Sequence, residues 1–301
     1  MSVKAESRYE KLREGGIAAL EAGRYDEAVE GFRAALEAAE EEGERERVFA
    51  ARCNLGTAYF ARHDYDDAIA GLREIILASR DDRTVGTAAL LASMALYKKH
   101  RLEKAREYLR VAEERGIRCG WHHLRANTAN QLGNVHLMMG AHEEAAEAYT
   151  TAIGIYSELP VAAYQRAAAL DNRGYVYVLL GRYREGFRDL RQALALAEEA
   201  NNPRTIASAC QDMAYGFIIR NHLQRGEKMA LRALGVATKH SFSDIVKNCY
   251  FLLMESAIRR DEQAKFDLYF DRLQELFPEV RLSRSFFRMF DITDILNLKE
   301  V

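Results

Sequence analysis

The sequence predicts an all-α protein: a right-handed solenoid of about seven helix pairs followed by a capping helix. Three observations support this fold class. The chain has 301 residues, a length sufficient for two ordinary domains or one elongated array. Its residues are 49% hydrophobic and 29% charged, which is typical of a folded protein. It has only three prolines in a background rich in Ala, Leu, Glu and Arg, which favours helices. A pattern of small and large residues also recurs about every 40 positions.

Each proline stands where a helix is expected to begin or end. Pro160 and Pro203 precede helical runs, and Pro278 follows one. Asn202, just before Pro203, is a candidate N-cap because its side chain can accept a hydrogen bond from a free N–H of the first turn. The prolines therefore mark helix boundaries.

The central copy of the repeat runs from Ala126 to Gly154 and predicts two helices joined by a tight turn. Such a pair leaves an apolar face uncovered, so it needs neighbours of the same kind. Equivalent small residues in the first helices are Gly16, Gly56, Ser93, Gly133, Gly174 and Ala214, with steps of 40, 37, 40, 41 and 40. Those of the second helices are Ala28, Ala68, Ala105, Ala145, Gly186 and Gly226. Two helices approach to about 8–10 Å only where the side chains between them are short.

Together these residues resemble the tetratricopeptide repeat family. The best matches are Asn54-Leu55-Gly56-x-x-Tyr59 with Ala68, and Leu132-Gly133 with Gly140, Ala145 and Ala152. The resemblance covers roughly residues 9 to 236 as six repeats. Its step of about 40 is similar to the longer-helix subgroup that includes kinesin light chains and bacterial peptide-pheromone receptors. The resemblance implies that the first helix of each pair lines a concave groove.

The pattern predicts three parts: six repeats over residues 5–240, a degenerate seventh pair over 241–278, and a C-terminal capping helix over 279–301. Met254 and Phe266 stand where small residues are expected, although helical periodicity continues. The last segment, Ser285 to Leu298, is rich in aromatic and aliphatic residues. It either caps the exposed end of the array or forms a dimerisation surface.

Composition and charge argue against several classes of partner. A formal net charge of -2 is unlike that of a general nucleic-acid binder. No window approaches 18 apolar residues, so we expect no membrane span, and the charged start does not resemble a signal peptide. The four cysteines are far apart, which predicts buried thiols in a reducing compartment, the cytoplasm. They are Cys53, Cys119, Cys210 and Cys249.

Motifs for catalysis, metal binding or cofactor binding are not found. Gly15-Gly16 lacks the spacing of a phosphate loop. The side chains of His122 and His123 would point apart by about 100° on a helix. We therefore expect a protein that is not an enzyme and carries no cofactor or metal.

The candidate binding residues flank the small position of the first helices, where the resemblance implies that they face the groove. Carboxamides recur there, although Asn is a mediocre helix former. A carboxamide offers a donor and an acceptor, as an extended peptide backbone does, so it can hold a segment through its main chain. The candidate peptide-binding residues are Asn54, Asn127, Asn130, Gln131, Asn134, Asp171, Asn172, Tyr175, Gln211, Asp212 and Tyr215.

Some of these residues have a structural alternative. Asn54 and Asn172 match a position that the resemblance associates with peptide grooves, but they can instead bridge adjacent repeats. Tyr175 and Tyr215 can contact a ligand or pack between repeats. Arg13 is the one basic residue at these inner positions, so we do not expect a clamp for an acidic chain terminus.

The predicted function is that of a scaffold that binds an extended protein or peptide segment in the groove. One alternative is a regulatory sensor that responds to a peptide and acts on a partner protein. Another is an assembly scaffold that self-associates through its aromatic C-terminal end. We expect no direct nucleic-acid or membrane partner.

Overall fold

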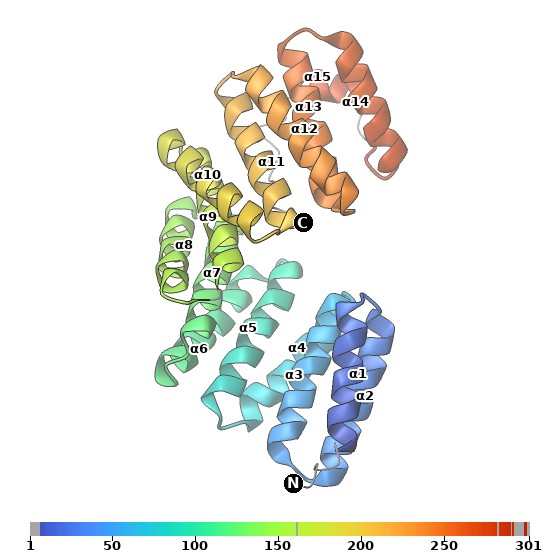
Figure 1. Ribbon diagram of the computed structural model, residues 1–301, viewed down its shortest axis with the longest axis vertical. Helices are drawn as coiled ribbons and strands as arrows, with labels where there is room; N and C mark the ends of the chain where they lie inside the picture. Colours follow the sequence, from blue (N-terminus) through green and yellow to red (C-terminus); the bar gives the residue numbers. More distant parts are fainter. Residues whose placement is uncertain (1–6, 161, 282, 290, 292–297, 300–301) are drawn as a thin grey trace. The chain divides into compact units, whose positions relative to one another are not determined.

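The computed structural model describes residues 7–160, 162–281, 283–289, 291 and 298–299. This part of the chain is all-α, with seven consecutive antiparallel helix pairs, a short fifteenth helix and no strand, as predicted (Figure 1). The helices are α1 (Arg8–Glu21), α2 (Tyr25–Glu42), α3 (Arg45–Ala61), α4 (Tyr65–Ala78), α5 (Asp82–Lys98), α6 (Leu102–Arg118), α7 (His122–Met138), α8 (His142–Ser157), α9 (Ala163–Leu179), α10 (Tyr183–Glu199), α11 (Pro203–Ile219), α12 (Leu223–Lys239), α13 (Ser243–Arg259), α14 (Gln263–Leu276) and α15 (Arg284–Met289).

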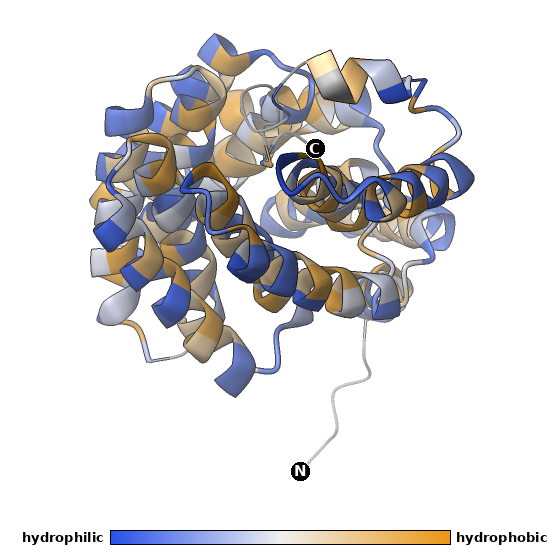
Figure 2. Cartoon of the chain, turned by 90° about the horizontal axis from the view of Figure 1, so that it is seen from above, coloured by the Kyte–Doolittle hydropathy of each residue, from blue (hydrophilic) through white to orange (hydrophobic). Residues whose placement is uncertain are grey.

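The chain divides into two compact units, a first unit of residues 1–135 and a second unit of residues 136–301. The division falls within α7. In each unit, helices that follow one another in the chain pack together, as α1 does on α2 and α9 on α10. Most helices carry hydrophobic residues on one face and hydrophilic residues on the other (Figure 2). The apolar faces form the core between neighbouring helices.

The turn within each helix pair has the same backbone conformation in all seven pairs. A residue with positive φ follows the first helix each time, and its position keeps the step of the small residues. These residues are Gly23, His63, His100, Gly140, Gly181, Asn221 and Asp261. Glycine, histidine, asparagine and aspartate are the types that adopt this conformation most readily. The residue after each one donates its N–H to a carbonyl five positions earlier, as Arg182 does to Tyr177 at 2.8 Å, which closes a Schellman turn.

Small residues in the first helices have the steric role that the repeat pattern predicts. A Cβ atom on Gly56 would lie 2.9 Å from the Leu72 side chain, and one on Gly174 would lie 2.8 Å from Leu190 Cγ. Ser93 is the polar exception and is fully buried. Its Oγ donates to the Leu90 carbonyl at 2.6 Å, so its polar group is satisfied within its own helix.

Helix boundaries also follow the sequence signals. Asn202 caps α11, since its side-chain oxygen accepts a 3.1 Å hydrogen bond from the Thr205 N–H and Pro203 occupies the first turn. Pro160 precedes α9, and Pro278 comes shortly after α14 ends. Asn202 thus confirms the predicted N-cap.

The seventh pair, α13 and α14, is built around large residues at the positions where the others have small ones. Met254 and Phe266 are buried in a cluster with Phe270, Leu273 and Phe287. Of the predicted last helix, the structure describes the six-residue α15 and a few other residues, among them Leu298 and Lys299, which lie in a turn. Phe290, Ile292, Ile295 and Leu296 lie outside the described residues. None of the helices in the described ranges is long and apolar enough to cross a membrane.

Candidate functional site

Two acidic side chains come together between first helices of the second unit. Asp171 lies on α9 and Asp212 on α11, two helices in direct contact. Both carboxyl groups are buried, with Asp212 completely inaccessible. Two buried carboxylates near each other are costly unless a cation lies between them. We call Asp171, Asp212 and the space between their carboxyl groups the acidic pocket. Its two carboxyl groups are placed to hold a positive charge.

The cation in this acidic pocket is the chain's own Lys299. Its Nζ lies 2.8 Å from Asp171 Oδ2 and 2.8 Å from Asp212 Oδ2. It also donates to Ser208 Oγ at 2.8 Å, and Ser208 in turn donates to Asp171 Oδ2 at 2.6 Å. The ammonium group stands 5.7 Å from the centre of the Tyr175 ring, within cation–π range.

The main chain next to Lys299 is held by side chains of the same surface. The Leu298 N–H donates to the Tyr175 hydroxyl at 3.3 Å, and Asn248 Nδ2 on α13 donates to the Leu298 carbonyl at 3.4 Å. The Leu298 side chain is buried in the core cluster that contains Tyr175 and Tyr215. Three first helices therefore bind one short segment through its backbone and both of its side chains.

Burial dominates the electrostatics of this acidic pocket. It raises the pKa of Asp212 to about 7, because the attraction of Lys299 does not fully offset desolvation and the nearby Asp171. Burial opposes the charge on Lys299 as well, but the two carboxylates outweigh it and raise the pKa of that amine. Two carboxylates and one ammonium leave one surplus negative charge, so repulsion from Asp171 adds to the effect of burial on the pKa of Asp212.

Lys299 does not satisfy every acceptor around it. Asp171 Oδ1 and Gln211 Oε1 are buried, and no hydrogen-bond donor in the described ranges reaches either atom. The Gln211 amide group instead points its Nε2 to Asp212 Oδ1, at 3.5 Å. The acidic pocket thus retains acceptor capacity that a larger cationic group could use.

Of the candidate residues of the second unit, five are brought together at this place. Asp171, Tyr175, Gln211, Asp212 and Tyr215 are all buried, and the rings of Tyr175 and Tyr215 lie 5.7 Å apart. Both tyrosines pack in the core between repeats, and Tyr175 also contacts the bound segment. The sixth candidate, Asn172, is half-buried on α9.

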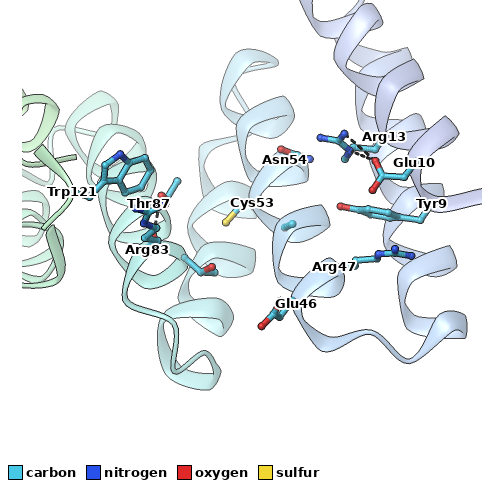
Figure 3. Close-up of a pocket in the computed structure, with 12 residues that line it drawn as sticks. Tyr9, Glu10, Arg13, Glu46, Arg47, Cys53, Asn54, Arg83, Thr87 and Trp121 are labelled. Atoms are coloured by element: carbon cyan, nitrogen blue, oxygen red, sulfur yellow. Dashed lines mark hydrogen bonds and ion pairs between the residues drawn. The ribbon is translucent and has the colours of Figure 1, made fainter. Parts of the chain in front are cut away.

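A separate cavity of about 550 Å³ lies among α1, α3 and α5 of the first unit (Figure 3). Asn54 and Cys53 line it from α3, and Trp121 lines it from just before α7. None of the four candidate amides of α7 lines this cavity. The helices that line this cavity, α1, α3 and α5, are all first helices of their pairs.

More basic residues line this cavity than the sequence pattern suggested, together with the acidic Glu10 and Glu46. Besides Arg13, which pairs with Glu10 at 2.9 Å, it is lined by Arg47 and Arg83. Arg47 stacks over the Tyr9 ring at 5.5 Å, and Arg83 stacks over Trp121 at 5.5 Å. Arg13 is thus not the only basic residue on the inner surface. The other two lie near the beginnings of their helices, away from the small position.

The candidate amides of α7 occupy mixed environments. Gln131 is buried, and its Oε1 accepts a 3.0 Å hydrogen bond from Asn134 Nδ2. Asn127 is exposed, whereas Asn130 Oδ1 is buried and has no hydrogen-bond partner in the part of the chain that the structure describes. Gln131 and Asn134 thus bond each other, and Asn130 keeps an open acceptor.

Sequence reasoning missed Asn248, Leu298 and Lys299 as parts of the acidic pocket. Asn248 stands six positions before Met254, as Ser208 stands six before Ala214 and Asn127 six before Gly133. Extending the repeat pattern into α13 would have found it. Leu298 and Lys299 lie outside any repeat, so no periodic signal marks them.

The cysteines differ in how far they are buried. Cys210 and Cys249 are buried, while Cys53 and Cys119 are half-buried, so only two of the four match the predicted burial. Burial raises the pKa of the Cys53 thiol to about 11 and that of Cys210 to about 11. Neither thiol is activated as a nucleophile.

Models of the tetratricopeptide repeat match residues 6–76, 84–158 and 166–206. With the paired helices, the recurrent turn and the small residues at each helix crossing, this match identifies the chain as a member of the tetratricopeptide repeat family. No protein of curated function matches the sequence significantly.

Solved structures with the same fold differ strongly in sequence. The apo form of RapI has 12% identity and a TM-score of 0.73, over 91% of this chain and 98% of its own. The Rap conjugation gene regulator of the plasmid pLS20, in complex with the Phr* peptide, has 16% identity and a TM-score of 0.61, over 92% and 77%. Kinesin light chain repeats of Podosopora anserina have 18% identity and a TM-score of 0.53, over 64% and 96%. These similarities establish the fold.

Proposed function

We propose that this tetratricopeptide repeat protein is a non-catalytic scaffold that binds an extended peptide on the first helices of its second unit. A Lys or Arg side chain of the peptide enters the acidic pocket between Asp171 and Asp212. Tyr175 and Asn248 hold the peptide main chain beside it. The bound molecule is thus a protein or peptide segment with a basic residue.

The observation that carries this proposal is the way Leu298 and Lys299 are held. The backbone N–H and C=O of Leu298 each have a side-chain partner, and the cation of Lys299 enters the acidic pocket. A surface that holds two residues of its own chain in this manner has the groups needed to hold a peptide.

The remaining candidate residues are assigned within each unit separately. Asn172, Gln211 and Tyr215 lie on the same two helices as the acidic pair, and we assign them to the neighbouring part of the peptide site. For the first unit, taken by itself, we propose Asn54, Asn127, Asn130, Gln131 and Asn134 as a separate set of contacts to a peptide main chain. The open acceptor of Asn130 supports such a role.

A regulatory sensor is the second candidate function. It is favoured by the fold shared with a conjugation gene regulator whose structure contains the Phr* peptide. In a sensor, the peptide changes the packing of the helices and thereby alters a contact with a partner protein. We propose the cytoplasm as its compartment, since the described cysteines are all free thiols.

The test is selection of peptides from a phage-displayed library of random heptapeptides. The immobilised proteins are the wild type, Asp171→Asn/Asp212→Asn, and the control Glu185→Gln/Glu199→Gln, which changes two acidic residues of α10. Circular dichroism first shows that all three are folded. The proposal predicts Lys- or Arg-containing peptides on the wild type and the control but not on the pocket variant. Equal enrichment of the same peptides on all three proteins would refute it.

A further inference from the structure

The acidic pocket is occupied by a residue that is remote in sequence. Lys299 lies 128 positions after Asp171, and its side chain is only 14% exposed. A peptide that places its own cation between Asp171 and Asp212 cannot enter while Lys299 is there, because two cations would share one small buried space. Under the proposed function, Lys299 and the ligand therefore compete.

The fit of Lys299 is good but incomplete. Its ammonium group donates hydrogen bonds to Asp171 Oδ2 and Ser208 Oγ and forms an ion pair with Asp212 Oδ2 at 2.8 Å. Asp171 Oδ1 and Gln211 Oε1 remain buried, with no donor within reach in the described structure. A guanidinium has five N–H donors in a planar fork and could satisfy more of these acceptors. An arginine side chain is thus better suited to the acidic pocket than the lysine that fills it.

The segment is also tied loosely by its backbone. The two hydrogen bonds of Leu298 measure 3.3 and 3.4 Å, longer than the usual 2.9–3.0 Å of a strong N–H···O bond. The Leu298 side chain is buried in the core cluster, so the segment is held by two long backbone hydrogen bonds and by two side chains. A peptide with a leucine followed by a basic residue offers the same groups and can replace each of these contacts.

We propose that Leu298 and Lys299 are an internal competitor that occupies the peptide site of the free protein and leaves when a ligand with an arginine side chain binds. This inference rests on the proposed function and adds its regulation. The chain thereby sets a threshold for its own ligand, since only a segment that binds better than Lys299 displaces it.

The size of the effect follows from the fraction of molecules with an open pocket. The apparent Kd equals the intrinsic Kd divided by that fraction. If Lys299 is docked nine times in ten, removing it strengthens ligand binding about tenfold. Removing an exposed lysine elsewhere leaves the affinity unchanged.

The first test measures binding of a fluorescein-labelled probe, Ala-Leu-Arg-Ala with a C-terminal amide, by fluorescence anisotropy. The proteins are the wild type, Lys299→Ala, and the control Lys265→Ala, which removes a lysine paired with Glu227 on another surface. We expect Lys299→Ala to bind about tenfold more tightly than the other two. Equal binding by all three would overturn internal competition and leave the peptide site standing. Absence of binding by all three, Lys299→Ala included, would overturn the proposed function as well.

A second test uses only the wild-type protein, so its result does not depend on whether a variant folds. Lysine amines are labelled with acetic anhydride, and the rate at Lys299 is followed by mass spectrometry with and without saturating unlabelled probe. We expect slow labelling of Lys299 in the free protein and labelling several-fold faster with the probe, while the rate at Lys265 stays constant. An unchanged rate at Lys299 while the probe is bound would refute displacement.

Discussion

Replacing Asp212 with asparagine is expected to change how the stability of the protein depends on pH. In the wild type, burial raises the pKa of Asp212 from 3.8 to about 7. A carboxyl group with a raised folded-state pKa stabilises the fold fully below its unfolded pKa, and this contribution is lost as pH rises through the folded pKa. Between about pH 4 and 7, the wild type therefore loses stability that the asparagine variant keeps.

The magnitude follows from the shift of about three pH units. Each unit corresponds to about 1.4 kcal/mol, so between about pH 5 and pH 7 the free energy of unfolding of the wild type falls by on the order of 2–3 kcal/mol relative to the variant. The charged neighbours Asp171 and Lys299 are present in both proteins. The difference between the two proteins therefore reports mainly on Asp212.

The assay is urea denaturation followed by far-ultraviolet circular dichroism at pH 5, 6, 7 and 8, with both proteins measured side by side. The control variant Glu185→Gln removes an exposed carboxyl group and should follow the wild type at every pH. A constant difference between wild type and Asp212→Asn across this range would refute the reasoning. It would mean that Asp212 is ionised throughout and that the acidic pocket is well solvated.

Four further predictions concern the free energy of unfolding. Gly174→Val should lower the free energy of unfolding by about 1–3 kcal/mol through overpacking, whereas Gly154→Ala, at an open helical position, should raise it by about 0.5–1 kcal/mol in thermal unfolding. Arg173→Met should lower the free energy of unfolding by about 3–5 kcal/mol, because Asp189 is buried and lies 2.7 Å from the Arg173 guanidinium. The double variant Arg173→Met/Asp189→Leu should lose less stability, and an equal loss in both variants would contradict this cause. If the last segment is a cap, Phe287→Ala should lower the free energy of unfolding by about 3–5 kcal/mol and leave the mass measured by light scattering unchanged. A variant that stays stable but has a lower mass would instead favour self-association.

The helix pairs could be predicted from the sequence because the contact that makes them is local. Gly56 and Leu72 meet within one pair, and Gly174 and Leu190 meet in the same way. A contact repeated at fixed spacing leaves a period in the sequence. In the seventh pair, Met254 replaces the small residue, so the sequence indicated this pair mainly through its helical periodicity. The turn at Asp261 shows that the pair keeps the spacing of the other six.

The acidic pocket could be predicted only in part. Asp171 and Asp212 were candidates because they flank small positions of the first helices, but nothing in the sequence showed that they share one buried cation. The contact with Lys299 joins residues 128 positions apart and occurs once, so it leaves no period. Arg47 and Arg83 were missed for another reason, since the inner face extends to the beginnings of the first helices, beyond the positions that flank the small residue.

The most direct test of the peptide site is a double-mutant cycle measured by isothermal titration calorimetry. A selected peptide is compared with its analogue in which citrulline, a neutral counterpart of arginine, replaces the basic residue. Each is titrated into the wild type and into Asp171→Asn/Asp212→Asn. We predict that citrulline weakens binding to the wild type by roughly 10- to 100-fold, as expected for a buried charged hydrogen bond of about 1.5–3 kcal/mol, and has little effect on the variant. An equal loss on both proteins would contradict the account, because the arginine would then bind somewhere other than the acidic pocket.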